Sequence, residues 1–148
     1  MKFLVMVKGE PKDEGQLPSL EAMAKMAKYN EELVKAGVMK SGEGLMPSSA
    51  GAKMSWRGSK RTVTDGPFTE AREVVGGFWI WECESLEAAK AWAEKIPFLG
   101  DSDIEIRQIA SMEHYAPNDP DGKISARQQK LREVIEAQAG DSGRFDTD

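Results

Sequence analysis

The chain has 148 residues, a net charge of −5 and a single cysteine. This length favours one domain with its own core. The acidic balance disfavours nucleic-acid binding, and the lone cysteine excludes an internal disulfide and suits a reducing compartment. The apolar run at residues 2–7 is too short for a secretory signal, and no stretch reaches the ~20 apolar residues of a membrane span. We therefore expect a cytoplasmic protein without direct nucleic-acid or membrane contact.

The N-terminal half predicts a strand, a helix and a second strand. Residues 2–8 are apolar on both faces, which is typical of a buried strand. Ser19 is the expected N-cap of a helix that runs to about Ala36, with Gly37 as its C-cap. The expected core stripe of this helix is Leu20, Met23, Ala27 and Val34, with Met26 and Leu33 beside it. A short strand over 38–46 follows.

A hairpin comes next in the sequence. Two short strands, 53–56 and 61–64, flank a Gly-Ser centre that suits a tight turn. Residues 65–67, Asp-Gly-Pro, then break the chain before an apolar strand at 74–81.

The last predicted elements complete a recognisable order. Ser85 can cap a second helix that ends at Pro97, and residues 103–112 read as a final strand. The order is β-α-β, an inserted hairpin, then β-α-β. It predicts a ferredoxin-like α+β fold, with a mainly antiparallel sheet and both helices on one face.

From Ala116 the composition changes. Residues 117–122 read as a linker, residues 123–139 as one helix and residues 140–148 as a frayed or disordered tail. The apolar side of that helix is expected to carry Ile124, Leu131, Val134 and Ile135. We predict a domain over residues 1–115 and an extension over 116–148 that is dispensable for folding.

The run Phe78–Trp79–Ile80–Trp81 places large apolar groups on both faces of its strand. Two helices cover only one face of such a sheet, so a second subunit is expected to pack face to face on the other. We expect a homodimer that buries the face carrying one of Trp79 or Trp81. The alternative is that the C-terminal helix folds over the open face.

Residues 63–73 read VTDGPFTEARE and are followed by Gly76–Gly77–Phe78. This segment resembles the signature of the DGPF proteins within the YCII-related family. The resemblance covers about residues 1 to 113 in the right order, with supporting matches at residues 2–5, 36–38, 42–45, 91–97 and 104–107. It implies a dimeric α+β barrel.

The resemblance also bears on mechanism. The wider family is associated with a catalytic His–Asp pair, with the histidine near the start of the first helix and the aspartate just before the proline that ends the second. Here the first helix contains no histidine and Ile96 precedes Pro97, so this mechanism is not transferred. DGPF proteins are often encoded beside extracytoplasmic-function sigma factors, which implies a regulatory alternative.

Carboxylates around the signature give the predicted site. Asp65 and Glu70 are the predicted catalytic pair, because burial and like charge would raise a carboxylate pKa as a general acid requires. The predicted ligand-binding residues are Glu43, Gly66, Pro67, Phe68, Arg72 and Glu73. Three structural alternatives stay open. Asp65 could fix a turn, Glu70 and Glu73 could form a solvated acidic turn, and Glu43 could be an edge-strand charge.

Other polar residues are weaker candidates. The hairpin cations Lys53, Arg57, Lys60 and Arg61 either solubilise the hairpin or, over a cavity mouth, favour an anionic ligand. His114, the only histidine, is expected to be structural or exposed, with cavity lining or axial haem ligation as alternatives. The acidic neighbours of Cys83 should raise its thiol pKa, which disfavours a nucleophile. A structural zinc site is excluded within one chain, and we predict no cofactor.

Two functions stay open. One is a small-molecule binder or enzyme that uses acid–base chemistry on a polar or anionic metabolite. The other is a non-catalytic accessory protein that works with an extracytoplasmic-function sigma factor through the C-terminal helix. The sequence leaves open whether the protein is an enzyme.

Overall fold

The computed structural model describes residues 1–98 and 101–142. It divides into two compact units, Met1–Ile109 and Ala110–Asp148. The first unit contains a sheet, two helices and a hairpin, and the second contains a 3₁₀ segment and one long helix.

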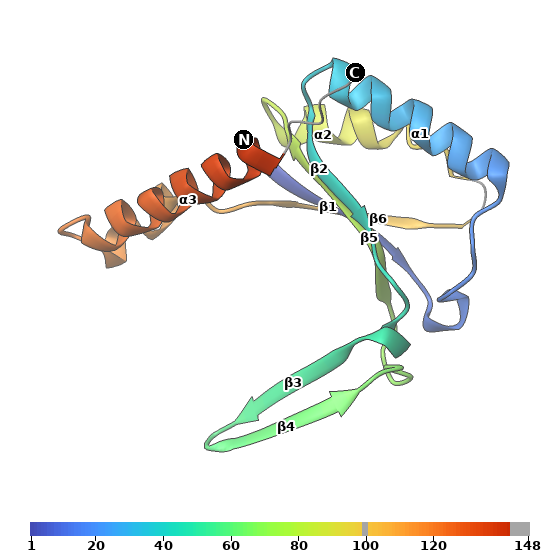
Figure 1. Cartoon of the computed structure of the whole chain (residues 1–148), viewed down its shortest axis with the longest axis horizontal. Helices are drawn as coiled ribbons and strands as arrows, with labels where there is room; N and C mark the ends of the chain where they lie inside the picture. The colour runs from blue at the N-terminus through green and yellow to red at the C-terminus, as the bar shows by residue number, and fades with distance from the viewer. Residues whose placement is uncertain (99–100, 143–148) are drawn as a thin grey trace. The chain divides into compact units, whose positions relative to one another are not determined.

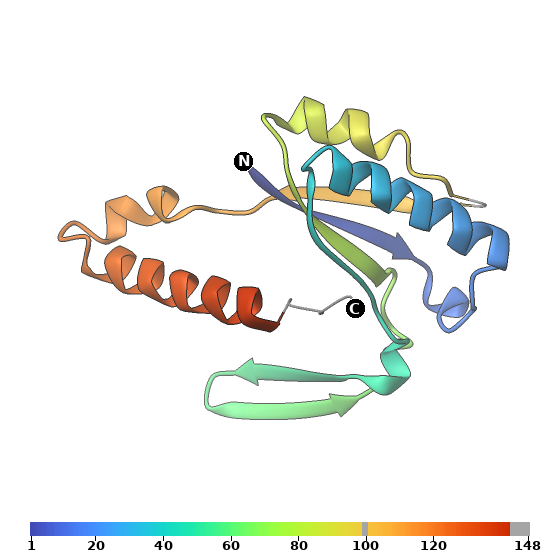
Figure 2. The ribbon, with the colours of Figure 1, turned by 45° about the horizontal axis from the view of Figure 1, so that its top comes forward.

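The first unit is built on a four-stranded antiparallel sheet of order β2-β5-β1-β6 (Figure 1). Its strands are β1 (Lys2–Gly9), β2 (Met39–Gly44), β5 (Val74–Glu82) and β6 (Asp103–Gln108). The helices α1 (Leu20–Lys35) and α2 (Leu86–Ala93) lie side by side on one face of the sheet (Figure 2). This arrangement confirms the predicted ferredoxin-like α+β fold.

Local signals in the sequence set the helix ends. The hydroxyl oxygens of Ser19 and Ser85 each accept a hydrogen bond from the backbone N–H three residues later, at 3.1 Å in both cases. Such caps satisfy backbone donors that the first helical turn leaves free. Gly37 follows α1 with φ +71°, a conformation that costs glycine least. Both predicted N-caps and the glycine C-cap are confirmed.

The core lies between the helices and the sheet. Phe3 and Val5 of β1 stand opposite Trp81 and Trp79 of β5, and all four side chains are buried. Leu33 of α1 is fully buried against this layer. Burial of a large apolar side chain contributes roughly 1.5–3 kcal/mol, so these residues account for much of the stability of the first unit.

The two tryptophans lie on the same face, under the helices, because residues two apart in a strand point the same way. The expectation that a tryptophan lies on the open face is therefore wrong. The open face carries Leu4, Met6, Phe78 and Ile80, which are half-buried in the single chain.

The core stripe of α1 also differs from the prediction. Leu20 is 83% exposed, and Met23 and Val34 are exposed as well. Tyr29 and Leu33 are the buried residues of this helix, with Met26 packed beside them. The helix has apolar residues on more than one side, so its periodicity fits either stripe. The side of the helix that carries Leu33 is buried because it packs with the tryptophans of β5.

The inserted hairpin is a separate two-stranded sheet, formed by β3 (Ala52–Arg57) and β4 (Lys60–Asp65). Gly58 in its turn has φ +59°. The short 3₁₀ turn η2 (Ser48–Ala50) leads into the hairpin, and the N–H of Gly66 donates to the carbonyl of Gly51 at its base (2.9 Å). A further 3₁₀ turn, η1 (Pro11–Asp13), follows β1.

The second unit consists of η3 (Met112–Asn118) and α3 (Lys123–Ser142). Asp119 accepts hydrogen bonds from the N–H groups of Ile124 and Ser125 and from the Ser125 hydroxyl, and these bonds lower the pKa of its carboxyl. The helix runs three residues past its predicted end, to Ser142, and the rest of the predicted disordered tail lies outside the described residues. Among the described residues, no helix is long and apolar enough to cross a membrane.

Candidate functional site

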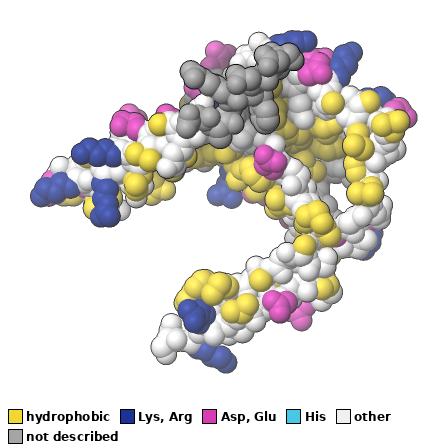
Figure 3. Space-filling view, viewed as in Figure 1, with side chains coloured by type: hydrophobic (Ala, Val, Ile, Leu, Met, Phe, Trp, Pro, Cys, Tyr) yellow, Lys and Arg dark blue, Asp and Glu magenta, His cyan; other side chains and the backbone are white. Residues whose placement is uncertain are grey.

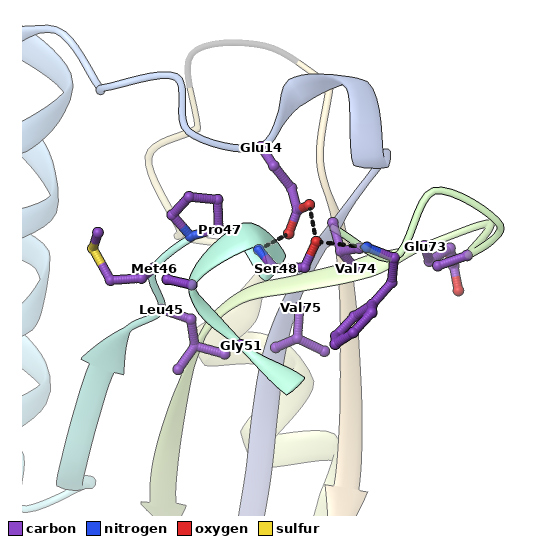
Figure 4. Close-up of a pocket in the computed structure, with 12 residues that line it drawn as sticks. Glu14, Leu45, Met46, Pro47, Ser48, Gly51, Glu73, Val74 and Val75 are labelled. Carbon is purple, nitrogen blue, oxygen red and sulfur yellow. Dashed lines mark hydrogen bonds between the residues drawn. The ribbon is translucent and has the colours of Figure 1, made fainter. Parts of the chain in front are cut away.

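A hydrogen-bond network joins three loops at the base of the hairpin (Figure 4). The carboxylate of Glu14 accepts from the N–H of Ser48 at 2.8 Å and from its hydroxyl at 2.6 Å. The Ser48 hydroxyl oxygen in turn accepts the N–H of Phe68 at 3.1 Å. Glu14 follows η1, Ser48 opens η2, and Phe68 belongs to the signature loop. One serine therefore ties the signature loop to two other segments.

Gly66 is needed for this same junction. A Cβ atom built on Gly66 would collide with the backbone carbonyl of Ser48, which cannot move as a flexible side chain can. Glycine is needed at this position because two stretches of backbone approach each other closely. The peptide bond between Gly66 and Pro67 is cis.

The network forms the wall of a cavity of about 390 Å³. Most of its lining is apolar, with carboxylates and one hydroxyl at a few points, a composition typical of small-molecule sites. The main lining residues are Leu45, Met46, Pro47, Phe68, Ala71, Val74 and Val75, with Glu14, Ser48 and Glu73 as the polar groups. Figure 4 shows the labelled residues arranged around this space. We call it the signature pocket.

A charged cluster lies at the edge of the pocket. The ammonium group of Lys8 contacts the carboxylates of Glu73 at 2.6 Å and Glu105 at 2.7 Å. Hydrogen bonding to Glu105 and then to Glu73 raises the pKa of Lys8, and hydrogen bonding to Lys8 lowers the pKa of Glu105. Glu73 therefore reaches the pocket as one member of an ion-pair cluster.

The predicted site residues fall into separate groups. Phe68 and Glu73 line the signature pocket. Asp65 ends β4 and is exposed, as are Glu70 and Arg72 in the loop that follows. Residues 69–70 form a turn, and residues 71–73 are not helical.

Glu43 lines a different cavity, of about 550 Å³, beside Trp79 and Asn30. The Asn30 side-chain carbonyl accepts the indole N–H of Trp79 at 3.0 Å. Neither this cavity nor the signature pocket includes Asp65 or Glu70. The single chain thus does not bring the three predicted carboxylates together.

The hairpin contributes one of its cations near the pocket. The ammonium group of Lys53 lies 5.6 Å from the centre of the Phe68 ring, a geometry suited to a cation–π contact. Lys53 is therefore a hairpin cation that lies near the pocket, where its charge would favour an anionic ligand.

The remaining candidates have structural roles. His114 is exposed, and its Nδ1 accepts the N–H of Ser111 at 3.1 Å, which caps η3. Cys83 is buried, and burial, followed by the nearby charge of Glu84, raises its thiol pKa. The raised pKa of Cys83 agrees with the sequence prediction, but burial is a larger cause than the acidic neighbour Glu84. Within the described part of the chain, no group of three or more His, Cys, Asp or Glu residues could hold a metal ion.

The segments that would carry a His–Asp pair meet at a groove of about 810 Å³, whose lining is partly apolar and includes the polar residues Asn30 and Asp101. The start of α1 contributes Ala22 and Met23, and the segment after α2 contributes Pro97 and Phe98. Neither a histidine nor the aspartate before the proline is present, so the groove lacks that acid–base pair.

Sequence reasoning missed Glu14 and Ser48. They lie 34 positions apart, and each by itself resembles an ordinary loop residue. The available signal was the Pro47–Ser48–Ser49 sequence, which is typical of a turn in which a serine hydroxyl bonds nearby groups but does not identify the partner.

Comparison with known proteins agrees with the architecture. The family profile of the YCII-related domain matches residues 1–113. An uncharacterised protein of Rhizobium meliloti (strain 1021) is 30% identical over 90 residues, which is 60% of this chain and 73% of that protein. The matched region covers the whole first unit, including the signature loop and its pocket. The chain therefore belongs to the YCII-related domain family.

Proposed function

We propose that the protein binds a small molecule in the signature pocket, as a member of the DGPF branch of its family. The observation that carries this proposal is the cavity itself, which is mainly apolar and has a wall fixed by the bonds of Ser48 to Glu14 and Phe68. Preformed apolar cavities with a few fixed polar groups are the usual form of small-molecule sites.

The lining indicates the class of ligand. The Glu14 carboxylate is engaged by Ser48, and the Glu73 carboxylate is paired with Lys8. Lys8 balances the charge of Glu73, whereas the hydrogen bonds from the neutral Ser48 leave the charge of Glu14 in place, so an anionic group of a ligand would lie away from Glu14. We propose a ligand with an apolar body and one polar or anionic group, the latter directed toward Lys53 beside the Phe68 ring.

We further propose that Asp65 and Glu70 carry out acid–base chemistry, which requires that they be shielded from water. Both residues are exposed to water in the single chain. A general-acid role therefore requires that a ligand or a second subunit remove water from them.

A thermal-shift screen of small carboxylic acids with apolar bodies tests the binding proposal. Ala50 lines the pocket and Ala24 is exposed on α1, so Ala50→Phe and Ala24→Phe form a matched pair. We expect ligands that stabilise the parent protein to stabilise Ala24→Phe equally and to lose their effect on Ala50→Phe. Equal shifts in both variants would place binding elsewhere.

The same screen separates binding from catalysis. Asp65→Asn and Glu70→Gln should keep the thermal shift if these residues only flank the pocket, since neither lines it. If they act as acids on the ligand, turnover should fall while binding persists. Loss of binding in both would mean that they contact the ligand.

We also propose that the protein is a homodimer in which two open sheet faces meet. Leu4, Met6, Phe78 and Ile80 form a continuous apolar surface on the face opposite the helices. Contiguous apolar surface of this kind typically marks an interface. Sedimentation equilibrium at micromolar concentration should give twice the 16.3 kDa chain mass. A stable monomer would refute the dimer without affecting the pocket.

A specific observation favours a second function, partner binding by α3. Ile124, Leu131 and Ile135 follow helical spacing and are 57%, 49% and 62% exposed. A helix that exposes apolar residues is a common form of protein ligand. Co-expression with an extracytoplasmic-function sigma factor should give co-purification that Leu131→Glu abolishes and Glu133→Gln preserves. Absence of co-purification would exclude this function.

A further inference from the structure

The hairpin has one apolar and one polar face. Met54 stands directly opposite Val63 in the register, and Trp56 lies two residues along the same strand face. The other face carries polar pairs such as Ser55 with Thr62. Met54, Trp56 and Val63 are 46%, 60% and 57% exposed. Figure 3 shows hydrophobic side chains gathered along one side of the hairpin.

An isolated two-stranded hairpin is marginally stable in water. This one pairs with no strand of the main sheet and is held at its base by the bond of Gly66 to Gly51 and by Lys53 beside Phe68. Exposure of a tryptophan there is costly, since an aromatic side chain buries roughly 150–250 Å² when covered. The apolar face therefore favours a partner.

The charge of the hairpin indicates the nature of that partner. The hairpin, residues 52–65, contains four cations and one acid, Asp65 at its end, whereas the rest of residues 1–109 contains sixteen acids and eleven cations. Arg61 stands opposite Trp56 and thus on the apolar face. A suitable partner combines an apolar surface with acidic groups at its border.

The open sheet face of a second copy has both properties. Its apolar residues include Met6 and Phe78, and the register places Glu105 opposite Met6 and Glu43 opposite Phe78. Residues directly opposite in an antiparallel pair share a face, so both carboxylates border the apolar surface, although Lys8 and Arg107 already pair with Glu105. Glu43 is exposed and available to a cation.

We propose that the hairpin is a dimerisation arm, with Met54, Trp56 and Val63 packed at the edge of the open sheet face of a second copy, beside the area where the two sheets meet, and with Arg61 near Glu43 of that copy. This proposal rests on the proposed homodimer and adds to it a defined contact. It is independent of ligand binding in the signature pocket.

Photo-crosslinking tests the contact directly. Trp56→p-benzoylphenylalanine in unlabelled chains is mixed with ¹⁵N-labelled parent chains, irradiated and digested. We expect crosslinks between light and heavy chains at residues 2–9 or 74–82. Thr62→p-benzoylphenylalanine, on the polar face, is the matched control and should give few. Crosslinks only within one chain, or only to α3, would overturn the arm.

Sedimentation equilibrium gives an independent measurement. We expect Trp56→Asp to weaken dimerisation at least tenfold and Thr62→Asp to change it less than twofold. A dimer of unchanged affinity in Trp56→Asp would overturn the arm while leaving the dimer intact. A monomeric parent protein would overturn both.

Discussion

Ser48→Ala tests the junction on which the signature pocket depends. The substitution removes a 2.6 Å bond from the hydroxyl to the Glu14 carboxylate and the acceptor of the 3.1 Å bond from the Phe68 N–H. A bond to a charged group contributes about 1.5–3 kcal/mol and a neutral one about 0.5–1.5 kcal/mol, and partial exposure favours the lower ends. We expect the free energy of unfolding to fall by about 2 kcal/mol.

Urea denaturation measures this loss, with Ser49→Ala as the adjacent, exposed control that should stay within about 0.5 kcal/mol of the parent protein. In a chain of this size the melting temperature should fall by about 4–8 °C. Amide hydrogen exchange at Phe68 should also become faster, because its N–H loses its acceptor. If Ser48→Ala and Ser49→Ala unfold alike and Phe68 keeps its protection, the junction is not held by these bonds.

Three further predictions concern other parts of the chain. Gly66→Ala should lower the free energy of unfolding by about 1–3 kcal/mol, measured by urea denaturation, because its Cβ meets the Ser48 backbone. Hydrogen bonding to Lys8 lowers the pKa of Glu105, so the stability from this pair is present above the ordinary pKa of 4.5 and is lost as the pH falls through the lowered value. Lys8→Met should therefore flatten the acid limb of a plot of melting temperature against pH, and an unchanged limb would contradict this. Truncation after Ala116 should leave the melting temperature within a few degrees, whereas a fall above about 10 °C would mean that the removed helix stabilises the core.

The carboxylates that were predicted to form the site are not all the ones that have partners in the structure. The sequence directed attention to the carboxylates of the signature, Asp65 and Glu70, which are exposed in the single chain. The structure engages Glu14, which was not predicted, with Ser48, and the predicted Glu73 with Lys8. A carboxylate shielded from water needs a donor or a cation close by, and such partners come from distant segments.

The sequence by itself determined the features that depend on near neighbours along the chain. The caps at Ser19 and Ser85 and the turn at Gly37 need only a few adjacent residues. The order of strands and helices followed from hydrophobic periods and breaks, and that order is restrictive enough to give the sheet topology.

Only the tertiary structure decided which faces are buried and which residues meet. Helix α1 has apolar side chains on more than one side, and packing against Trp79 and Trp81 selected Leu33 over Leu20. The bond between Glu14 and Ser48 spans 34 positions and leaves no periodic signal in either segment. Hydrophobic burial and long-range hydrogen bonds are properties of spatial neighbours, so they become definite only once the sheet brings distant segments together.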